Sequence, residues 1–150
     1  IILCLGSSAD IFNLKHFFYA SHITKYIFWC IMGAKVDFRI NSSIFATLRD
    51  YPLLTIKQGS TMGANVFISA HTFIGDKVIL APVYIGQNVY LGMNVVVGPD
   101  SHIGDGCWIG VNNIIFKDTI PNNTKIDNFE WEHQNPEKNK KTKKSKSSRK

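Results

Sequence analysis

Aliphatic residues recur at every sixth position over the second half of the chain. The row consists of Ile85, Leu91, Val97, Ile103, Ile109 and Ile115, and each of its first five members is followed by glycine. An α-helix repeats about every 3.6 residues and a strand every 2, so neither produces this spacing. A six-residue repeat is typical of a parallel β-helix, in which each short side of a coil carries one unit. The pattern therefore predicts an all-β stack of short strands around an apolar interior.

The repeat extends upstream with one shift in register. Ile56, Met62, Ile68, Ile74 and Leu80 are six apart, but Ile85 follows Leu80 after only five residues, so the shift falls at Ala81-Pro82. Further upstream Asp50 stands where the row expects an apolar residue, and we interpret residues 49–52 as a loop. With about 18 residues in each coil, the chain holds about four or five coils.

A second rule supports this interpretation. The fourth residue after each aliphatic one is mostly small or branched, and we expect it to point inward: Ser60, Val66, Thr72, Val78, Val89, Val95, Ser101, Cys107, Asn113 and Thr119. Glycine, asparagine and aspartate fall between these positions, where they tolerate the tight backbone of a corner. Cys107 is accordingly predicted to be a small core residue.

The two ends of the chain differ from this middle part. Apolar residues three and four apart predict helices over residues 11–32, with Asp10 as an N-cap and Gly33 at the end. We therefore divide the chain into a helical cap over 1–33, a β-helix domain over 34–130 and a disordered, Lys-rich tail over 131–150. Phe28 and Trp29 are expected to pack on the first coil.

The net charge of +6 comes from the tail. Residues 133–150 hold eight of the 17 Lys and Arg residues and one of the 11 Asp and Glu residues, so the rest of the chain carries nine basic and ten acidic residues. A nearly neutral body does not indicate a nucleic-acid interface. The basic tail and the aromatic helices are, however, suited to weak contact with a membrane surface.

Three widely spaced cysteines without a CxxC pair argue against a disulfide framework or a zinc site. They favour a reducing compartment, so we expect a cytoplasmic protein, peripheral to the membrane if the ends bind it. No apolar run reaches the roughly 18 residues that a membrane span needs.

Three segments resemble signatures of the hexapeptide-repeat acyltransferases, whose fold is a left-handed parallel β-helix. Residues 82–92 (PVYIGQNVYLG) are similar to the family's PV-x-IG-x-NV-x-IG, residues 97–106 (VGPDSHIGDG) to its PG-x-x-IGDG, and residues 116–124 (FKDTIPNNT) to its K-D-IP-x-N-T. Within the family the chain resembles the sugar O-acetyltransferases and the related terminal domains of amino-acid-polymer synthetases. The resemblance implies transfer of an acetyl group from acetyl-CoA to a hydroxyl or amine acceptor, such as a sugar. It also implies a homotrimer and no metal.

Acyl transfer to a hydroxyl needs a base, because a neutral alcohol is a poor nucleophile, and histidine titrates closest to neutral pH. His71 lies just before the register shift, where the family has its catalytic histidine, so the resemblance assigns it as the general base. Asn65 and Asp76 are its candidate orienting partners.

By the same match, Gly92 and Gly110 are candidates for close approach to the pantetheine arm of coenzyme A, and Lys117 for a phosphate. The family's GAGS reads Gly110-Val111-Asn112-Asn113 here, and its closing GNPA is absent. The alternative is therefore a catalytically inactive β-helix that serves as a binding or structural module. The γ-type carbonic anhydrases share the fold, but they need three zinc-binding histidines, and only His71 and His102 lie within the predicted coils.

Overall fold

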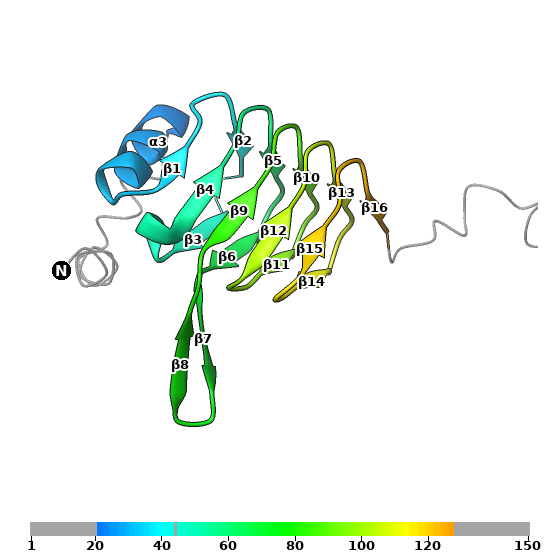
Figure 1. Cartoon of the computed structure of the whole chain (residues 1–150). Helices are drawn as coiled ribbons and strands as arrows, with labels where there is room; N and C mark the ends of the chain where they lie inside the picture. The colour runs from blue at the N-terminus through cyan, green and yellow to red at the C-terminus, as the bar shows by residue number, and fades with distance from the viewer. Residues whose placement is uncertain (1–20, 44, 128–150) are drawn as a thin grey trace, which may run out of the picture.

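The chain winds into a parallel β-helix that extends coil by coil away from a short N-terminal helix (Figure 1). The computed structural model describes residues 21–43 and 45–127. These form about five coils, which confirms the predicted all-β fold and is consistent with the left-handed form. No helix among the described residues has both the length and the apolar composition needed to cross a bilayer.

Three parallel sheets form the sides of the prism. Sheet A consists of β1 (Lys35–Val36), β4 (Leu54–Ile56), β9 (Val83–Ile85), β12 (Ser101–Ile103) and β15 (Thr119–Ile120). Sheet B consists of β2 (Asn41–Ser42), β5 (Thr61–Met62), β10 (Tyr90–Leu91), β13 (Trp108–Ile109) and β16 (Lys125–Ile126). Sheet C consists of β3 (Thr47–Arg49), β6 (Phe67–Ser69), β11 (Val96–Val97) and β14 (Ile114–Ile115). The 3-10 helix η1 (Tyr51–Leu53) connects β3 to β4.

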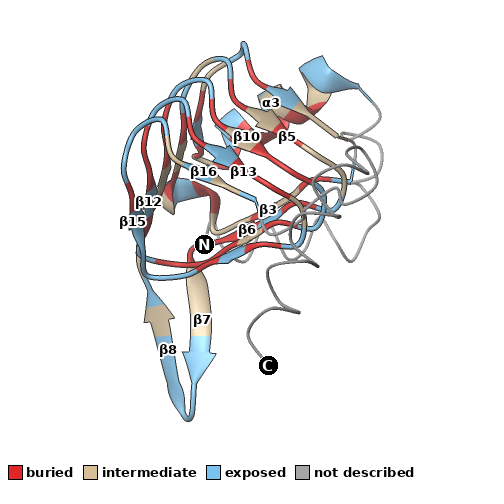
Figure 2. Ribbon diagram, turned by 90° about the vertical axis from the view of Figure 1, so that its right-hand side faces the viewer, coloured by how far each residue is buried: buried red, intermediate tan, exposed pale blue. Residues whose placement is uncertain are grey.

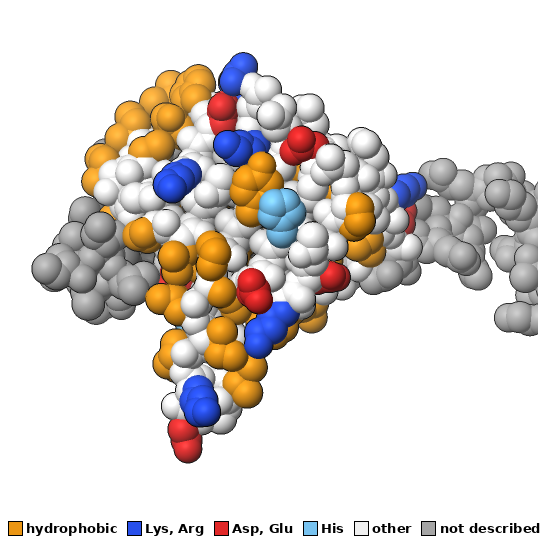
Figure 3. All heavy atoms as spheres, viewed as in Figure 1, with side chains coloured by type: hydrophobic (Ala, Val, Ile, Leu, Met, Phe, Trp, Pro, Cys, Tyr) orange, Lys and Arg blue, Asp and Glu red, His pale blue; other side chains and the backbone are white. Residues whose placement is uncertain are grey.

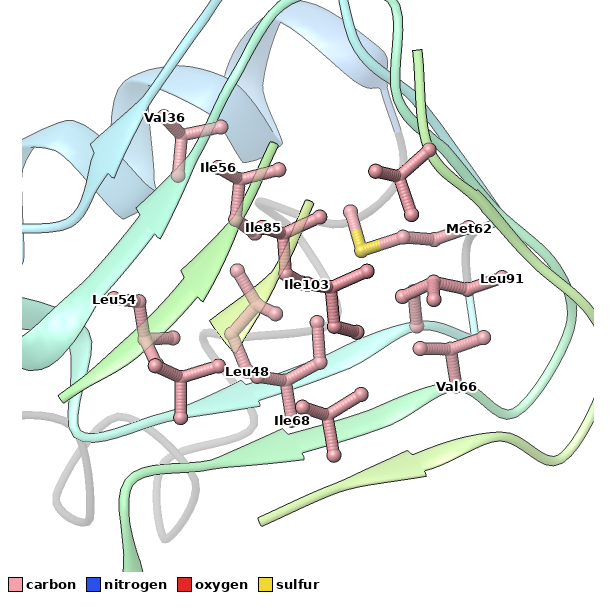
Figure 4. Close-up of a cluster of buried hydrophobic side chains, with 14 of the residues drawn as sticks. Val36, Leu48, Leu54, Ile56, Met62, Val66, Ile68, Ile85, Leu91 and Ile103 are labelled. Atoms are coloured by element: carbon pink, nitrogen blue, oxygen red, sulfur yellow. The ribbon is translucent and has the colours of Figure 1, made fainter. Parts of the chain in front are cut away.

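The aliphatic row fills the interior of the prism. In sheet A the register stacks Val36, Ile56, Ile85, Ile103 and Ile120 on one another, one from each coil. Sheets B and C contribute equivalent ladders, such as Met62 on Leu91 and Leu48 on Ile68 (Figure 4). All six members of the row from Ile85 to Ile115 are buried. One coil cannot bury its apolar side alone, so each coil is stabilised by its neighbours.

The predicted interior row is wrong at the register shift. Ile74 and Leu80 are more than half exposed, because residues 71–80 leave the prism as an antiparallel hairpin. Thr72 and Val78 lie on the same hairpin and do not point into the core either.

The second rule also fails at its last position, Thr119. The register pairs Val97 with Ile115 and His102 with Thr119, so the later corner is one residue shorter and Thr119 is exposed. The other positions that the second rule predicted to point inward are buried: Ser60, Val66, Val89, Val95, Ser101, Cys107 and Asn113.

The corners use asparagine as predicted. Asn65, Asn88, Asn94, Asn112 and Asn123 all have a φ between 53° and 59°. Asparagine tolerates this left-handed conformation because its short polar side chain finds local hydrogen-bond partners. Here the Asn94 amide donates to the Asn112 side-chain oxygen of the next coil at 3.0 Å, so the corners are also linked along the prism.

Helix α3 (His22–Ile31) covers the N-terminal end of the prism, as predicted for the second part of residues 11–32. It ends in a Schellman motif: Gly33 has a φ of 94°, and the Gly33 and Ala34 amides donate to the Cys30 and Trp29 carbonyls. Phe28 and Trp29 are buried against the first coil, which confirms their predicted packing. The first predicted helix and the tail lie outside the described residues.

Lys25 connects α3 to the first coil. Its buried ammonium donates hydrogen bonds to the carbonyls of Ser42 and Ser43 and lies 5.2 Å from the Trp29 ring centroid. These carbonyls belong to the end of the stack, where an uncovered strand edge would invite pairing with another chain. Burial lowers the pKa of Lys25 to about 8. The outward side of α3 exposes Ile23, Ile27 and Ile31, the surface available for the predicted membrane contact.

Candidate active site

The one antiparallel hairpin of the described chain marks the candidate site. Strands β7 (His71–Ile74) and β8 (Lys77–Leu80) project from the corner between sheets C and A (Figures 1 and 2). The Ala81 amide donates to the Ala70 carbonyl at 2.9 Å and closes the base of the hairpin. His71 is the first residue of β7, so its side chain lies where the hairpin meets the prism.

His71 forms a hydrogen-bonded pair with Asp50 from the preceding coil. The distance from His71 Nδ1 to Asp50 Oδ2 is 2.5 Å. The Asp50 side chain is 9 % exposed and the His71 side chain 34 % exposed, so the carboxylate is shielded and the imidazole still reaches solvent. Such a charge-assisted bond is among the stronger ones in proteins and fixes the orientation of the ring.

Asp50 is held by further donors. The Ala70 amide donates to Asp50 Oδ2 at 3.1 Å, and Ser69 Oγ lies 3.3 Å from the same oxygen. Asp50 itself has a φ of 59°, a left-handed conformation that aspartate tolerates at a corner. The register places Arg49 beside Ser69, so the corner after β3 lies directly against the corner after β6. Stacking of two coils therefore brings Asp50 to His71 across 21 positions of sequence.

The carboxylate determines what the imidazole can do. Asp50 accepts the Nδ1 proton, so the lone pair of the neutral ring is on Nε2. No described residue hydrogen-bonds Nε2. An oriented, partly exposed imidazole with this tautomer can take a proton from a substrate hydroxyl, and the carboxylate stabilises the imidazolium that results.

Ser69 is a positioning residue rather than a nucleophile. Its hydroxyl lies 3.2 Å from His71 Nδ1, the nitrogen that already faces Asp50. A nucleophilic serine would have to contact the nitrogen that acts as base, which is Nε2 here. The three side chains therefore do not form a serine-nucleophile triad, and the base is available to a substrate.

The sequence-based candidates for the orienting partner lie elsewhere. Asp76 is in the turn at the tip of the hairpin, between Ile74 and Lys77, while His71 is at its base. Asn65 is an exposed corner residue between β5 and β6 with a φ of 56°. Asp50, which sequence reasoning missed as a site residue, occupies the orienting position instead. Its signal was present: a carboxylate interrupted the apolar row about one coil before the histidine.

Gly92 and Gly110 lie together at the corner between sheets B and C, a different edge of the prism from His71. A methyl group added at Gly92 would be 2.8 Å from the Gly110 carbonyl carbon, and one at Gly110 would be 3.1 Å from the Ile126 carbonyl oxygen. Gly92 is therefore needed for the coils to stack, and Gly110 occupies a tight position against the next coil, whether or not a ligand approaches them.

Lys117 lies on the same edge as His71. It follows β14 at the corner between sheets C and A, where its amide donates to the Pro99 carbonyl. Its side chain is exposed, with Nζ 5.8 Å from the Phe116 ring centroid, and is available to an anionic ligand. It lies two coils beyond the hairpin, roughly 10 Å along the prism. Within the described part of the chain, no group of three His, Cys, Asp or Glu side chains is arranged to hold a metal ion.

Comparison with known families agrees with the repeat. Residues 82–117 match the family model described as bacterial transferase hexapeptide (six repeats). The match covers β9 to β14 and includes Gly92, Gly110 and Lys117, while His71 and Asp50 lie outside it. Hexapeptide-repeat domains of this kind are typical of transferases, including acyltransferases. A search of curated proteins finds no match to the chain.

Proposed function

We propose that this protein is an acyltransferase that moves an acetyl group from acetyl-CoA to a hydroxyl or amine acceptor, such as a saccharide. The observation that carries the proposal is the His71–Asp50 pair at the base of the hairpin. The hexapeptide match over residues 82–117 supports the reaction class.

The reaction requires one base that takes a proton from the acceptor and then gives it to the departing thiolate. His71 Nε2 removes the proton from the acceptor hydroxyl while the hydroxyl oxygen attacks the acetyl carbonyl. Asp50 holds the ring and stabilises the imidazolium that forms. When the carbon–sulfur bond breaks, the same proton is returned from Nε2 to the departing thiolate, so that the base is regenerated.

Acetyl-CoA suits the edge of the prism between sheets C and A, where both His71 and Lys117 lie. The exposed ammonium of Lys117 would bind a phosphate of its nucleotide end, on the same edge as His71. Gly92 and Gly110 add no side chain of their own to their corner, although the Asp127 carboxylate lies 2.8 Å from the Cβ position of Gly110, and a pantetheine arm would lie against this backbone in a neighbouring copy.

We further propose that the active form is a homotrimer packed through the outer side of sheet C. The outward residues of β6, β11 and β14 are Phe67, Val96 and Ile114, whose side chains stack in register. The corresponding residues of sheet A are Lys35, Thr55, Tyr84, His102 and Thr119, and those of sheet B are Asn41, Thr61, Tyr90, Trp108 and Lys125, so both sheets mix aromatic with polar or charged side chains. Sheet C is thus the most apolar side and the best suited to contact a second copy.

Turnover of acetyl-CoA tests the proposal. Free thiol release is measured with a panel of sugars and amines for the wild type, His71→Ala and His102→Ala. Loss of a general base typically costs about 10²–10⁴-fold in rate, which we expect for His71→Ala alone. His102→Ala is the matched control, because His102 is exposed on sheet A and stacks on Tyr84.

Two results would contradict the proposal. If the wild type neither binds nor consumes acetyl-CoA, the enzyme assignment fails and a binding module remains. If His71→Ala and His102→Ala are equally active, His71 is not the base.

A further inference from the structure

The side of the hairpin that carries His71 is apolar. Directly opposed residues of an antiparallel pair point to the same face, and so do residues two apart on one strand. His71 is opposite Leu80, and Phe73 is opposite Val78. These four residues therefore share one face, which we call the His71 face. The T-shaped contact between the His71 and Phe73 rings, with centroids 5.8 Å apart, agrees with this arrangement.

The apolar part of the His71 face is open to solvent. Phe73 is 70 % exposed, Val78 60 % and Leu80 52 %. In the view of Figure 3, hydrophobic side chains run along much of the hairpin, and the charged ones gather at its tip. A two-stranded hairpin has no second layer of its own to cover them. A contiguous apolar surface of this kind marks a site where something binds.

We propose that the His71 face binds the apolar part of the acyl acceptor. The inference rests on the proposed function, since it uses His71 as the base. A general base must lie within hydrogen-bond reach of the hydroxyl that it deprotonates. The carbon frame of the acceptor then lies beside the imidazole, where Leu80 and Phe73 flank it on the same face.

The length of the face favours the acceptor over the acetyl group. The distance from His71 to Phe73 along the strand is about 7 Å, which is longer than a two-carbon acyl group. A bare sugar has too little contiguous apolar surface to cover three apolar side chains and would gain little from them. The chemical class that fits is an alcohol or amine with a hydrophobic substituent near the reacting group, which includes a sugar that carries an apolar aglycone.

Two primary alcohols of opposite character test the inference. We compare kcat/KM for 3-phenyl-1-propanol and for glycerol with acetyl-CoA in the wild type, Val78→Ser and Ile74→Ser. Val78 is on the His71 face, while Ile74 is a similar β-branched and exposed residue on the other face of the same hairpin. We expect the wild type to prefer 3-phenyl-1-propanol. Burying a valine side chain is worth about 1.5 kcal/mol, so Val78→Ser should lower the preference about 10-fold. Ile74→Ser should leave it unchanged.

Several outcomes would overturn the inference. One such outcome is a preference for 3-phenyl-1-propanol that is unchanged in Val78→Ser, or that falls equally in Ile74→Ser. A second outcome is that Val78→Ser changes the ratio of kcat/KM for acetyl-CoA and butyryl-CoA but leaves the ratio for the two alcohols constant. That result would assign the face to the acyl chain. A third outcome is a lower sedimentation coefficient for Val78→Ser than for the wild type, which would assign the face to contact with a second copy.

Binding separates this inference from the proposed function. If no acceptor is turned over, the acyltransferase proposal fails, and saturation-transfer NMR of 3-phenyl-1-propanol decides about the face. Transfer to the ligand in the wild type and Ile74→Ser, but several-fold weaker transfer in Val78→Ser, would support an apolar ligand site. Absence of transfer in the wild type would overturn it.

Discussion

A carboxylate at one corner and an imidazole at the next carry the chemistry proposed for this chain. Asp50 and His71 are adjacent only because consecutive coils stack in register, with Leu48 on Ile68 and Arg49 beside Ser69. Asp50 follows β3 and His71 closely follows β6, and these two strands pair within the prism, so the pair is already formed without a substrate. Such preorganisation is the main way in which proteins make a weak base effective.

For the single residue Asp50, we predict the effect of removing its charge. In Asp50→Asn, kcat should fall about 10²-fold with little change in KM, because the carboxylate orients and stabilises the charged ring. The downfield proton resonance of His71 Nδ1–H should also be lost from the NMR spectrum. Ser69→Ala is the comparison: it removes one hydrogen bond around Asp50 but keeps the carboxylate and its 2.5 Å contact with His71, so its loss of kcat should be much smaller.

Two results would contradict the prediction for Asp50→Asn. Equal losses of kcat in Asp50→Asn and Ser69→Ala would make the whole corner merely structural. An unchanged resonance in Asp50→Asn would mean that the Nδ1 proton has another partner.

At the scale of elements, sequence predicted the coils well and the hairpin poorly. The row from Ile85 to Ile115 was correct because an uninterrupted repeat leaves each inward position a single choice. Ile74 and Leu80 kept the six-residue spacing by coincidence, and residues 71–80 instead form an antiparallel pair. Spacing alone cannot distinguish the two, because an aliphatic residue on an exposed hairpin and one in the core look alike in sequence.

The candidate site was predicted only in part for the same reason. His71 was predicted because it precedes the register shift, where the family that the chain resembles has its catalytic histidine. Its partner was sought among residues near it in sequence or one coil side earlier. Asp50 is 21 positions away, close to the length of one coil, and contact at that separation follows from the stacking of coils. A polar residue that interrupts an otherwise apolar row is therefore the signal to look for in such repeats.

Helix α3 and the first coil are joined by a titratable group. The pKa of Lys25 is lowered from 10.5 to about 8 by burial. Between these pH values the unfolded chain binds the proton and the folded chain does not, so raising the pH favours the folded state.

We therefore predict a pH-dependent difference between the wild type and Lys25→Met. Relative to Lys25→Met, the free energy of unfolding of the wild type should rise by about 1.5 kcal/mol between pH 8 and 9.5. Urea unfolding at a series of pH values measures it, and all other titrating groups cancel in the difference. A difference that stays constant from pH 7 to 10 would show that Lys25 titrates as an ordinary exposed lysine does.

At the scale of the whole molecule, the three sides of the prism differ in character. Stacked aromatic pairs lie on the other two sheets, with the Tyr84 and His102 rings 4.4 Å apart on sheet A and the Tyr90 and Trp108 rings 4.0 Å apart on sheet B. These rings are satisfied within the chain by cross-strand pairing. The apolar residues on the outside of sheet C, Phe67, Val96 and Ile114, also stack on one another, but their outer surfaces stay exposed or partly exposed to solvent.

The proposed trimer is tested by a charge on sheet C. Ile114 is 73 % exposed, so Ile114→Lys should not disturb the core of a single chain. A lysine within an apolar interface would be buried without a partner, and we expect dissociation to monomers in analytical ultracentrifugation. Thr119→Lys on sheet A is the control. A monomeric wild type, or equal dissociation in both variants, would contradict packing through sheet C.

The closed end of the prism has a consequence for how the protein is made. Chains leave the ribosome N-terminus first at about 5–20 residues per second, so α3 and the first coil emerge before the rest. Because α3 and Lys25 cover that coil from one side, the growing stack exposes only the edge of its newest coil. Each further coil of about 18 residues then takes roughly one to four seconds to appear and meets a finished template. We therefore expect the nascent chain to expose a single unpaired strand edge at a time to its neighbours on a polysome, until the next coil pairs with it.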